Sequence, residues 1–262
     1  ECVGASNVTI DGLVLENTDR TKDYSYSYKT NDTGCGVKIS DSDNITVSNC
    51  IIRNVGGHGV YLVNSGKSNL ITANDIYNTY STGISCNGEG NSTFTDNIIS
   101  NNHVHSTGLI IPSSTGIALY HAGAENTVIT NNLVHDSPRS AIRVEKVNAE
   151  NHITYNDLYD VNKGSQDTGV IYTYGLGKNA KTHIENNYIH DSKSYIEKTI
   201  ALYIDDYSYG TIAKNNIIYN MQKNDEEDIF GYCIYAKGDN AVIENNYIVG
   251  NPTSGAVIGS YA

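Results

Sequence analysis

The stretch Asn186-Asn187-Tyr188-Ile189 returns as Asn215-Asn216-Ile217-Ile218 and again as Asn245-Asn246-Tyr247-Ile248. Each copy joins an apolar run, an Asn and a second apolar run. Eight copies occur, spaced 25, 23, 34, 25, 30, 29 and 30 residues apart, at Asn49, Asn74, Asn97, Asn131, Asn156, Asn186, Asn215 and Asn245. A period of this length indicates a stacked repeat architecture.

Each repeat contains three short runs. The first follows a Gly or another small residue, as in Gly59-Val60-Tyr61-Leu62, the second resembles Asn126-Thr127-Val128-Ile129, and the third follows the recurring Asn. The runs alternate apolar with polar residues and favour Ile, Val, Thr and Tyr, which is typical of strands. We therefore predict an all-β fold, a right-handed parallel β-helix of about nine coils with three short strands per coil.

The recurring Asn is expected at the bend between the second and third strands. An Asn there tolerates the left-handed backbone conformation and can hydrogen-bond to the Asn of the next coil. Leucine-rich repeats, propellers and sandwiches fit the pattern less well, because Ile and Val dominate and one register persists throughout. We expect residues 1–262 to form one β-helix domain. No polar cap is evident at either end, so we also expect it to belong to a longer chain.

The composition excludes several partners. The formal net charge of −12 and the pI near 5.0 argue against nucleic acid, which requires a basic surface. No apolar run is long enough for membrane insertion. The five cysteines form no CxxC pair or zinc spacing, and we expect buried thiols, with a Cys2–Cys35 disulfide left open.

The longer repeats carry insertions, at roughly 19–34, 103–114, 161–168, 192–199 and 221–230. All of them fall between a third strand and the next first strand. Insertions at one corner of a solenoid stack along one side of it, so they should form walls beside the sheet of first strands. Insertions on one face are often the binding face, so this sheet is the predicted location of a site.

Polar side chains on that sheet are the candidate ligands. If Ile142 and Val144 point inward, their neighbours along the strand point outward, and the same alternation applies to the strand containing Leu202 and Ile204. In the strand between them, either Ile171 or Tyr172 faces outward, depending on the register. Aromatic rings, carboxylates and a few cations suit a carbohydrate. The expected substrate-binding residues are His121, Arg143, Glu145, Tyr172, Tyr203 and Lys237.

Three carboxylates are the candidate catalytic residues. Asp167 precedes one first strand, and Asp205 and Asp206 end the next. Glycoside cleavage uses a pair of carboxylates, one as acid and one as base or nucleophile. Straight strands would leave about six residues of roughly 3.3 Å each between Asp167 and Asp205, which is too far. The 161–168 loop must therefore fold back, or the Asp205–Asp206 pair must use another partner.

The segments Asp167-Thr168-Gly169-Val170-Ile171-Tyr172 and Leu202-Tyr203-Ile204-Asp205-Asp206 give the chain a resemblance to a known group. The stretches 102–105, 132–142, 151–156 and 187–191 fit it as well. The chain resembles secreted bacterial right-handed parallel β-helix glycoside hydrolases of the kind grouped as glycoside hydrolase family 141.

This resemblance implies an extracellular or periplasmic location. It also implies that the carboxylates of the site are Asp167 together with Asp205 or Asp206, and that His121, Arg143 and Tyr172 line the site. The chain departs from similar proteins at Thr130, where His is common, and at Thr154, where Glu is common. We interpret the histidines at third-strand ends as repeat-position residues rather than ligands; these are His103, His105, His135 and His190.

Three functions are compatible with these features. The first is a glycoside hydrolase acting on a plant or algal polysaccharide or oligosaccharide with paired Asp chemistry. The second is a polysaccharide lyase or uronan epimerase, which would use a Lys, Arg, His or Tyr base and often Ca²⁺. The third is a non-catalytic glycan-binding or adhesin β-helix. We find no cofactor motif and expect no cofactor and no metal, with Ca²⁺ reserved for the lyase alternative.

Overall fold

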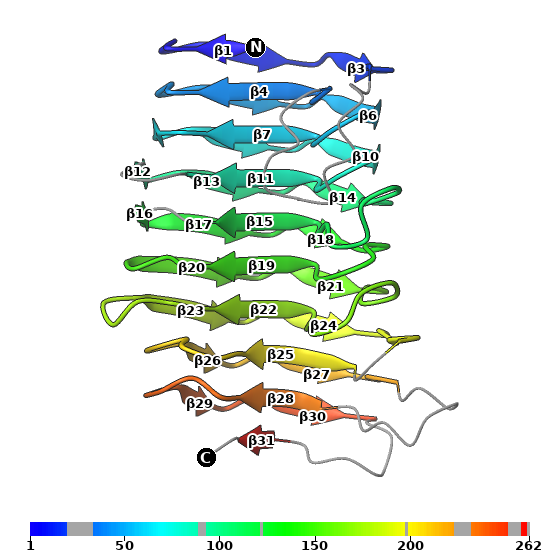
Figure 1. Ribbon diagram of the computed structural model, residues 1–262, viewed down its shortest axis with the longest axis vertical. Coiled ribbons are helices and arrows are strands. Elements are labelled where there is room, and N and C mark those ends of the chain that lie inside the picture. Colours follow the sequence, from blue (N-terminus) through cyan, green and yellow to red (C-terminus); the bar gives the residue numbers. More distant parts are fainter. Residues whose placement is uncertain are drawn as a thin grey trace.

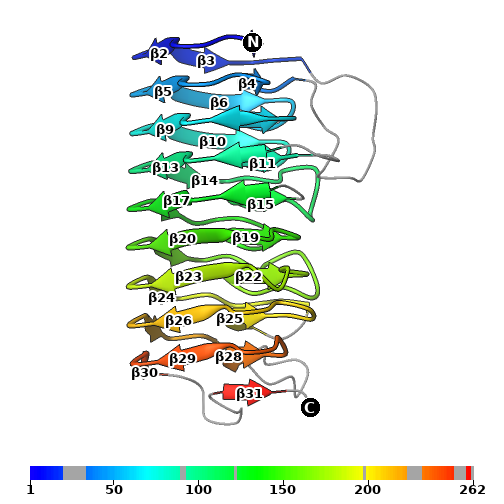
Figure 2. The ribbon, with the colours of Figure 1, turned by 90° about the vertical axis from the view of Figure 1, so that its left-hand side faces the viewer.

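The chain winds into a right-handed parallel β-helix, as its repeat predicts (Figure 1). The computed structural model describes residues 1–19, 34–88, 93–120, 123–196, 199–222, 232–250 and 258–260. Three parallel sheets run the length of the stack, and each coil contributes one strand to each of them (Figure 2). Nine complete coils are followed by one further strand. None of the described residues belongs to a helix that is long and apolar enough to cross a membrane.

The first sheet has ten strands and carries the candidate site. It contains β1 (Cys2–Val3), β4 (Val37–Ser40), β7 (Val60–Val63), β11 (Ile84–Asn87), β15 (Ile117–Tyr120), β19 (Ile142–Glu145), β22 (Ile171–Tyr174), β25 (Ile200–Ile204), β28 (Tyr232–Ala236) and β31 (Ile258–Ser260).

The second and third sheets have nine strands each. The second contains β2 (Thr9–Asp11), β5 (Thr46–Ser48), β9 (Leu70–Thr72), β13 (Ile98–Ser100), β17 (Thr127–Thr130), β20 (Glu150–Thr154), β23 (Lys181–Glu185), β26 (Ile212–Lys214) and β29 (Val242–Glu244). The third contains β3 (Val14–Glu16), β6 (Ile51–Val55), β10 (Asp75–Thr79), β14 (His103–His105), β18 (Leu133–Val134), β21 (Asp157–Tyr159), β24 (Tyr188–His190), β27 (Ile217–Tyr219) and β30 (Tyr247–Val249).

Three coils add a fourth strand that the sequence pattern does not predict. A small sheet at the corner between the first and second sheets is formed by β8 (Gly66–Lys67), β12 (Thr93–Thr95) and β16 (Gly123–Glu125). Each is only two or three residues long, too short to show an alternation.

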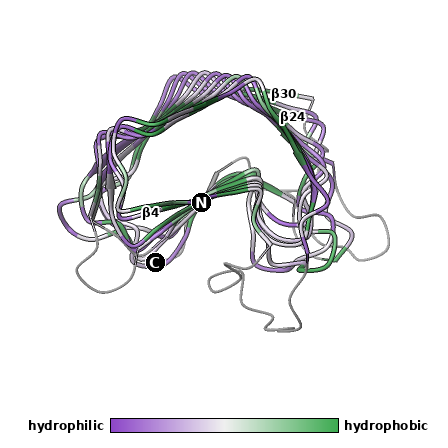
Figure 3. Ribbon diagram, turned by 90° about the horizontal axis from the view of Figure 1, so that it is seen from above, coloured by the Kyte–Doolittle hydropathy of each residue, from purple (hydrophilic) through white to green (hydrophobic). Residues whose placement is uncertain are grey.

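The core is a set of aliphatic rows along the helix axis. On the first sheet, one inward row contains Val60 and the residues that the strand register aligns with it on later coils, each fully buried: Ile84, Ile117, Ile142, Ile171, Leu202 and Ile234. Viewed along the axis, the coils superimpose closely (Figure 3). Each coil buries its apolar side chains against its neighbours, so coils stabilise one another rather than themselves.

A ladder of buried asparagines holds the corner between the second and third sheets. The Asn156 Oδ1 atom accepts hydrogen bonds from the backbone N–H and the side-chain amide of Asn132, both at 3.0 Å. The Asn156 Nδ2 atom donates to Ile129 O and to Asn187 Oδ1, at 3.0 and 2.9 Å. Every polar atom of the buried amide is thus paired. The ladder consists of Asn74, Asn102, Asn132, Asn156, Asn187, Asn216 and Asn246.

The predicted turn role of the recurring asparagines is confirmed in most coils, but their predicted ladder role belongs to the next residue. The prediction gave one Asn both the turn and the ladder, but the structure divides these tasks between adjacent residues. Asn131 has a φ of 54° and makes the turn, whereas Asn132 carries the ladder. Asn49, Asn186, Asn215 and Asn245 are likewise left-handed turn residues, and only Asn74 and Asn156 of the predicted series are ladder residues.

Asn97 belongs to a different corner, the turn into the second sheet. Its Oδ1 accepts from the backbone N–H of Asn69 at 2.9 Å, and its Nδ2 donates to Gly66 O at 3.2 Å. The sequence signal was the same, because Asn suits either turn, but the hydrogen-bond partners differ.

The insertions lie where they were predicted, between a third strand and the next first strand. Residues 106–116 separate β14 from β15, and residues 160–170 separate β21 from β22. The predicted insertions at 19–34 and 221–230 lie largely outside the described residues. Cys2, Cys50, Cys86 and Cys233 are buried thiols, as expected, whereas Cys35 is only partly buried. Cys50 occupies the ladder position of its coil, where its backbone N–H donates to Asn74 Oδ1 at 3.0 Å.

Replacing the central ladder residue should destabilise the stack. Asn156→Ala leaves the Asn132 N–H and the Ile129 carbonyl buried without partners, and we expect the free energy of unfolding to fall by about 2–4 kcal/mol. The matched control is Tyr155→Asn, at an exposed neighbour with a φ of 55°. Because Asn tolerates this conformation better than Tyr, the control should lose no stability. Thermal and urea unfolding measure the stability of both variants. Equal losses of stability would contradict the assignment of Asn156 to the ladder.

Candidate active site

Two rows of polar and aromatic side chains run along the outer face of the first sheet. The strand register aligns Arg143 with Tyr172, Tyr172 with Tyr203, and Tyr203 with Tyr235. The second row aligns Tyr120 with Glu145 and Glu145 with Tyr174. Backbone bonds from Asp205 N to Thr173 O (3.0 Å) and from Lys237 N to Ile204 O (2.7 Å) extend it through Asp205 and Lys237.

The alternation of the sequence therefore places most of the candidate residues correctly. Arg143 and Glu145 face outward while Ile142 and Val144 belong to the core, and Tyr203 and Asp205 face outward beside Leu202. The open question about the middle strand is settled in favour of Tyr172, because Ile171 is a core residue. His121 lies outside the described residues.

Asp205 is the hub of the cluster. Its Oδ2 accepts a 2.7 Å hydrogen bond from the Tyr172 hydroxyl, and its Oδ1 accepts a 2.6 Å bond from Lys237 Nζ. Only 3% of the residue's surface is exposed. Lys237 also donates to the Tyr203 hydroxyl at 3.2 Å and lies 3.2 Å from Asp206, which is exposed. Lys237 and Tyr172 thus hold a buried carboxylate, and Tyr203 contacts the same cation.

Asp167 comes close to this hub because its loop folds back over the sheet. Its φ is 51°, a left-handed turn, and its carbonyl accepts a 2.8 Å hydrogen bond from Arg139 Nη2. The Tyr203 hydroxyl hydrogen-bonds to its carboxylate. Gly169 permits the fold: a Cβ there would lie 2.7 Å from Tyr203 Cβ. The loop therefore brings Asp167 to Tyr203, whose hydroxyl accepts a hydrogen bond from Lys237, the cation that also holds Asp205.

The two carboxyl groups have pKa values displaced in opposite directions. Partial burial and the nearby charge of Asp205 raise the pKa of Asp167, against the opposing effects of Arg139 and the Tyr203 hydrogen bond. Burial acts to raise the pKa of Asp205 too, but hydrogen bonds from Lys237 and Tyr172 outweigh it and lower that pKa. At mildly acidic pH, Asp205 therefore loses its proton before Asp167 does. Divergent carboxyl pKa values are the arrangement that separates an acid from a base.

The other polar groups of the hub hold their protons more tightly than usual. Burial, together with the hydrogen bond to Asp205, raises the pKa of Tyr172, and burial raises that of Tyr203. Lys237 is partly buried, which would lower its pKa, but its bonds to Asp205 and Tyr203 raise it overall. None of these three is poised to act as a base at neutral pH.

Arg143 and Glu145 form a buried ion pair rather than an open binding surface. Their residues are only 4% and 3% exposed, and Arg143 Nε donates to Glu145 Oε1 at 2.7 Å. The Arg143 guanidinium lies over the rings of Tyr120 and Tyr172, each 5.4 Å from the ring centroid. The pair therefore supports Tyr172 from the preceding coil.

Arg139 is the site residue that the alternation could not identify, because it lies in a wall loop and not in a strand. Its guanidinium lies 5.3 Å from the centroid of the Tyr172 ring while it holds the Asp167 carbonyl. The only sequence signal was its place in the resembling stretch 132–142. By contrast, Thr130 and Thr154 hydrogen-bond to each other at 3.1 Å on the second sheet, so these two departures do not fall in this cluster.

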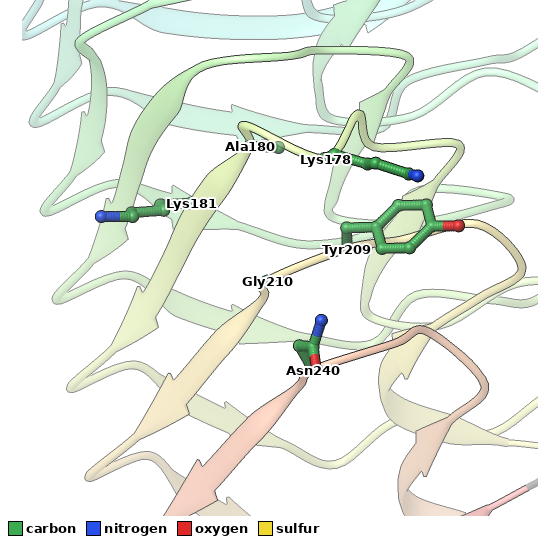
Figure 4. A pocket seen from close by; sticks show the side chains of 6 residues that line it. All are labelled: Lys178, Ala180, Lys181, Tyr209, Gly210 and Asn240. Atoms are coloured by element: carbon green, nitrogen blue, oxygen red, sulfur yellow. The ribbon is translucent and has the colours of Figure 1, made fainter.

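A pocket lies beyond the strand ends, in the turns that lead from the first sheet to the second (Figure 4). Figure 4 shows Lys178 beside the Tyr209 ring and Lys181 pointing away from both. No carboxylate lines this pocket, so it does not offer the paired-acid chemistry of the cluster around Asp205. Its lining is Lys178, Ala180, Lys181, Tyr209, Gly210 and Asn240.

The architecture defines a single-stranded right-handed β-helix with an outward cluster of acids, tyrosines and cations on its first sheet. The family model "Right handed beta helix region" matches residues 3–158, 35–196 and 115–262, which together cover nearly the whole chain. The chain belongs to this family. No curated protein matches the sequence.

Solved structures of the same fold share little sequence with the chain. A glycoside hydrolase has a TM-score of 0.60 at 14% identity over 81% of this chain, which spans only 38% of that protein's length. An alginate lyase from Paenibacillus sp. str. FPU-7 has a TM-score of 0.62 at 16% identity, covering 95% of this chain and 80% of the other. A DFA-IIIase from Arthrobacter chlorophenolicus A6, in complex with GF2, has a TM-score of 0.55 at 14% identity, covering 95% of this chain and 69% of the other. At these identities the likeness establishes the fold.

The hydrogen bond from Tyr172 should have a pH-dependent effect on stability. Tyr172→Phe removes a bond to an ionised carboxylate, and we expect a loss of about 1.5–3 kcal/mol at pH 7. The bond lowers the pKa of Asp205, so its contribution is present above the unfolded value of about 3.9 and is lost as pH falls through the lowered folded value. Urea unfolding between pH 7 and pH 2 measures this.

The control for that series is Tyr174→Phe, the same substitution on the outer face of the same strand. We expect its effect on stability to stay constant across the acid range. A Tyr172→Phe loss that persisted unchanged at pH 2 would contradict the bond to Asp205 as its source.

Proposed function

We propose that the protein is a glycoside hydrolase that acts on a plant or algal polysaccharide or oligosaccharide, outside the cell or in the periplasm. The observation that carries the proposal is that Tyr203 and Lys237 connect Asp167 to Asp205, while the pKa values of the two carboxyl groups are displaced in opposite directions. Asp167 is the proton donor to the leaving oxygen. Asp205 is the ionised carboxylate that stabilises positive charge at the anomeric carbon or assists the attacking group.

Accessibility supports this division of roles. Asp167 lies on a wall loop, where its partly buried carboxyl group still reaches solvent and a glycosidic oxygen, and a raised pKa keeps its proton available. Asp205 lies lower, held by Tyr172 and Lys237, where its charge acts over a short distance in a protected setting. Asp206 shares Lys237 from the solvent side and is a second candidate for the ionised partner.

The aromatic row supports a sugar ligand. Tyr172 and Tyr203 meet edge to face, with centroids 5.4 Å apart, and Tyr203 and Tyr235 lie 5.2 Å apart. Tyr232 stacks on Tyr235 at 4.9 Å. Tyr232 and Tyr235 are partly exposed and offer ring faces to a pyranose, whereas Tyr172 and Tyr203 are buried beneath the surface and support them. Arg139 adds a hydrogen-bond donor beside this row.

A polysaccharide lyase or uronan epimerase is the second candidate. Arg139, Arg143 and Lys237 lie around the tyrosines and could neutralise a uronate, and an alginate lyase is among the proteins of the same fold. The raised pKa values of Tyr172, Tyr203 and Lys237 weigh against it, since proton abstraction requires one of them to lose its proton readily. A non-catalytic glycan-binding role is the third.

The test measures reducing sugar released from a panel of plant and algal glycans. Asp167→Asn and Asp205→Asn should each lower turnover by about 10²–10⁴-fold, because each removes one member of the acid–base pair. Asp41→Asn, at an exposed turn aspartate far from the cluster, is the matched control and should retain activity. Each protein is assayed with and without EDTA, and products are monitored at 235 nm for unsaturated ends.

The outcomes separate the three candidates. The hydrolase is supported if both site variants lose turnover, the products are saturated, and EDTA does not change the activity of the wild-type protein. Products with unsaturated ends would instead identify the protein as a lyase. Glycan binding without turnover across the panel would leave the binding role.

A further inference from the structure

A second cluster of ligating groups lies on the outer face of the second sheet, away from the site on the first sheet. Strand β20 carries Glu150 and His152, two residues apart and therefore on the same face. The register aligns His152 with His183 on β23. Two neighbouring coils thus bring one carboxylate and two imidazoles together, and neither the repeat nor the proposed hydrolase chemistry requires them.

The spacing of these groups is that of ligands around one ion. The Glu150 Oε1 atom lies 3.3 Å from His183 Nε2 and 3.5 Å from His152 Nε2. The ligating atoms of the three residues all fall within 4.8 Å of one another, and the imidazole rings stack with centroids 4.8 Å apart. Bonds of about 2.0–2.1 Å to a tetrahedral ion place ligand atoms roughly 3.4 Å apart. An ordinary N–H···O bond is shorter, at about 2.7–3.2 Å.

A fourth residue fixes the orientation of one imidazole. His183 Nδ1 lies 3.0 Å from Glu185 Oε1, with hydrogen-bond geometry. An ionised carboxylate only accepts hydrogen bonds, so Nδ1 carries the proton, and a neutral His183 then presents the lone pair of Nε2 to Glu150. A lone pair facing a carboxylate oxygen is repulsive unless a cation lies between them. A carboxylate behind a ligating histidine is the usual support of a metal site.

We propose that Glu150 Oε1, His152 Nε2 and His183 Nε2 bind one divalent transition-metal ion of the Zn²⁺ type, with Glu185 as the positioning residue behind His183. Two imidazoles and one carboxylate suit such an ion, whereas Ca²⁺ and Mg²⁺ prefer all-oxygen sites. The ion would cross-link two adjacent coils and would leave a coordination position open to water or a partner. The proposal is independent of the proposed hydrolase activity.

Another histidine cluster has to be removed before the test. Asp75, His103 and His105 on the third sheet also come within 4.8 Å of one another. There His103 Nδ1 faces Asp75 at 3.2 Å, but its second nitrogen meets His135 Nε2 at 2.9 Å, so an imidazole and not a carboxylate lies behind it. The substitutions His103→Gln and His105→Gln therefore form the background for every measurement.

The experiment titrates Zn²⁺ into the full chain in this background at pH 7.5 by isothermal calorimetry, and Co²⁺ by its visible absorption. We expect one site with a micromolar dissociation constant. Adding His152→Gln and His183→Gln should abolish binding, and Glu185→Gln should weaken it by about 10–100-fold. Lowering the pH to 5.5 should weaken Zn²⁺ binding to the background protein, because both imidazoles must be neutral to bind the ion.

The variants must retain their far-UV circular dichroism and their melting temperature in EDTA, which separates loss of the ion from loss of the fold. Zn²⁺ should raise the melting temperature of the background protein but not that of the variant lacking both histidines. Binding that survives His152→Gln and His183→Gln would overturn the proposal. So would no binding at millimolar Zn²⁺, which would show that a proton on His183 balances the two glutamates instead.

Discussion

The pairing of each buried ladder asparagine with the asparagine of the next coil is the constraint on which the other features depend. The carboxamide has two N–H donors and one acceptor oxygen. At Asn156 these groups bond to Asn132 and Ile129 of the preceding coil and to Asn187 of the next coil, so one side chain joins three successive coils. A one-residue slip of any coil would leave several of these buried groups without partners, at about 1–3 kcal/mol each. The ladder therefore stabilises the turn between the second and third sheets and sets the register of neighbouring coils.

That register aligns the chemistry of the first sheet. Residues 33 apart in the chain, such as Tyr172 and Asp205, meet because β22 and β25 are locked side by side with Ile171 opposite Leu202. The core rows set which side chains face out, and the corner loops are free of the stacking requirement, so Asp167 can be carried back over the sheet. The same alignment places His152 beside His183 on a different face.

The period and the alternation predicted the fold class, the location of the insertions and the outward direction of Arg143, Tyr203 and Asp205. They failed where two adjacent residues carry signals that look alike: Asn131 makes a turn and Asn132 a ladder bond, and only backbone geometry separates them. They also failed for Arg139 and for the approach of Asp167, since the path of a loop depends on packing such as that of Gly169 against Tyr203. Strand alternation predicts which way Arg143 and Glu145 point but not that the two side chains are buried.

The proposed chemistry requires that Asp167 keeps its proton at a pH where Asp205 has lost its own. It is tested most directly by following the side-chain carboxyl ¹³C resonances of the aspartates as a function of pH, with assignments taken from Asp167→Asn and Asp205→Asn. The Asp167 resonance should titrate above the usual aspartate range and the Asp205 resonance below it. Titration of both groups together near the ordinary value of about 3.9 would contradict it.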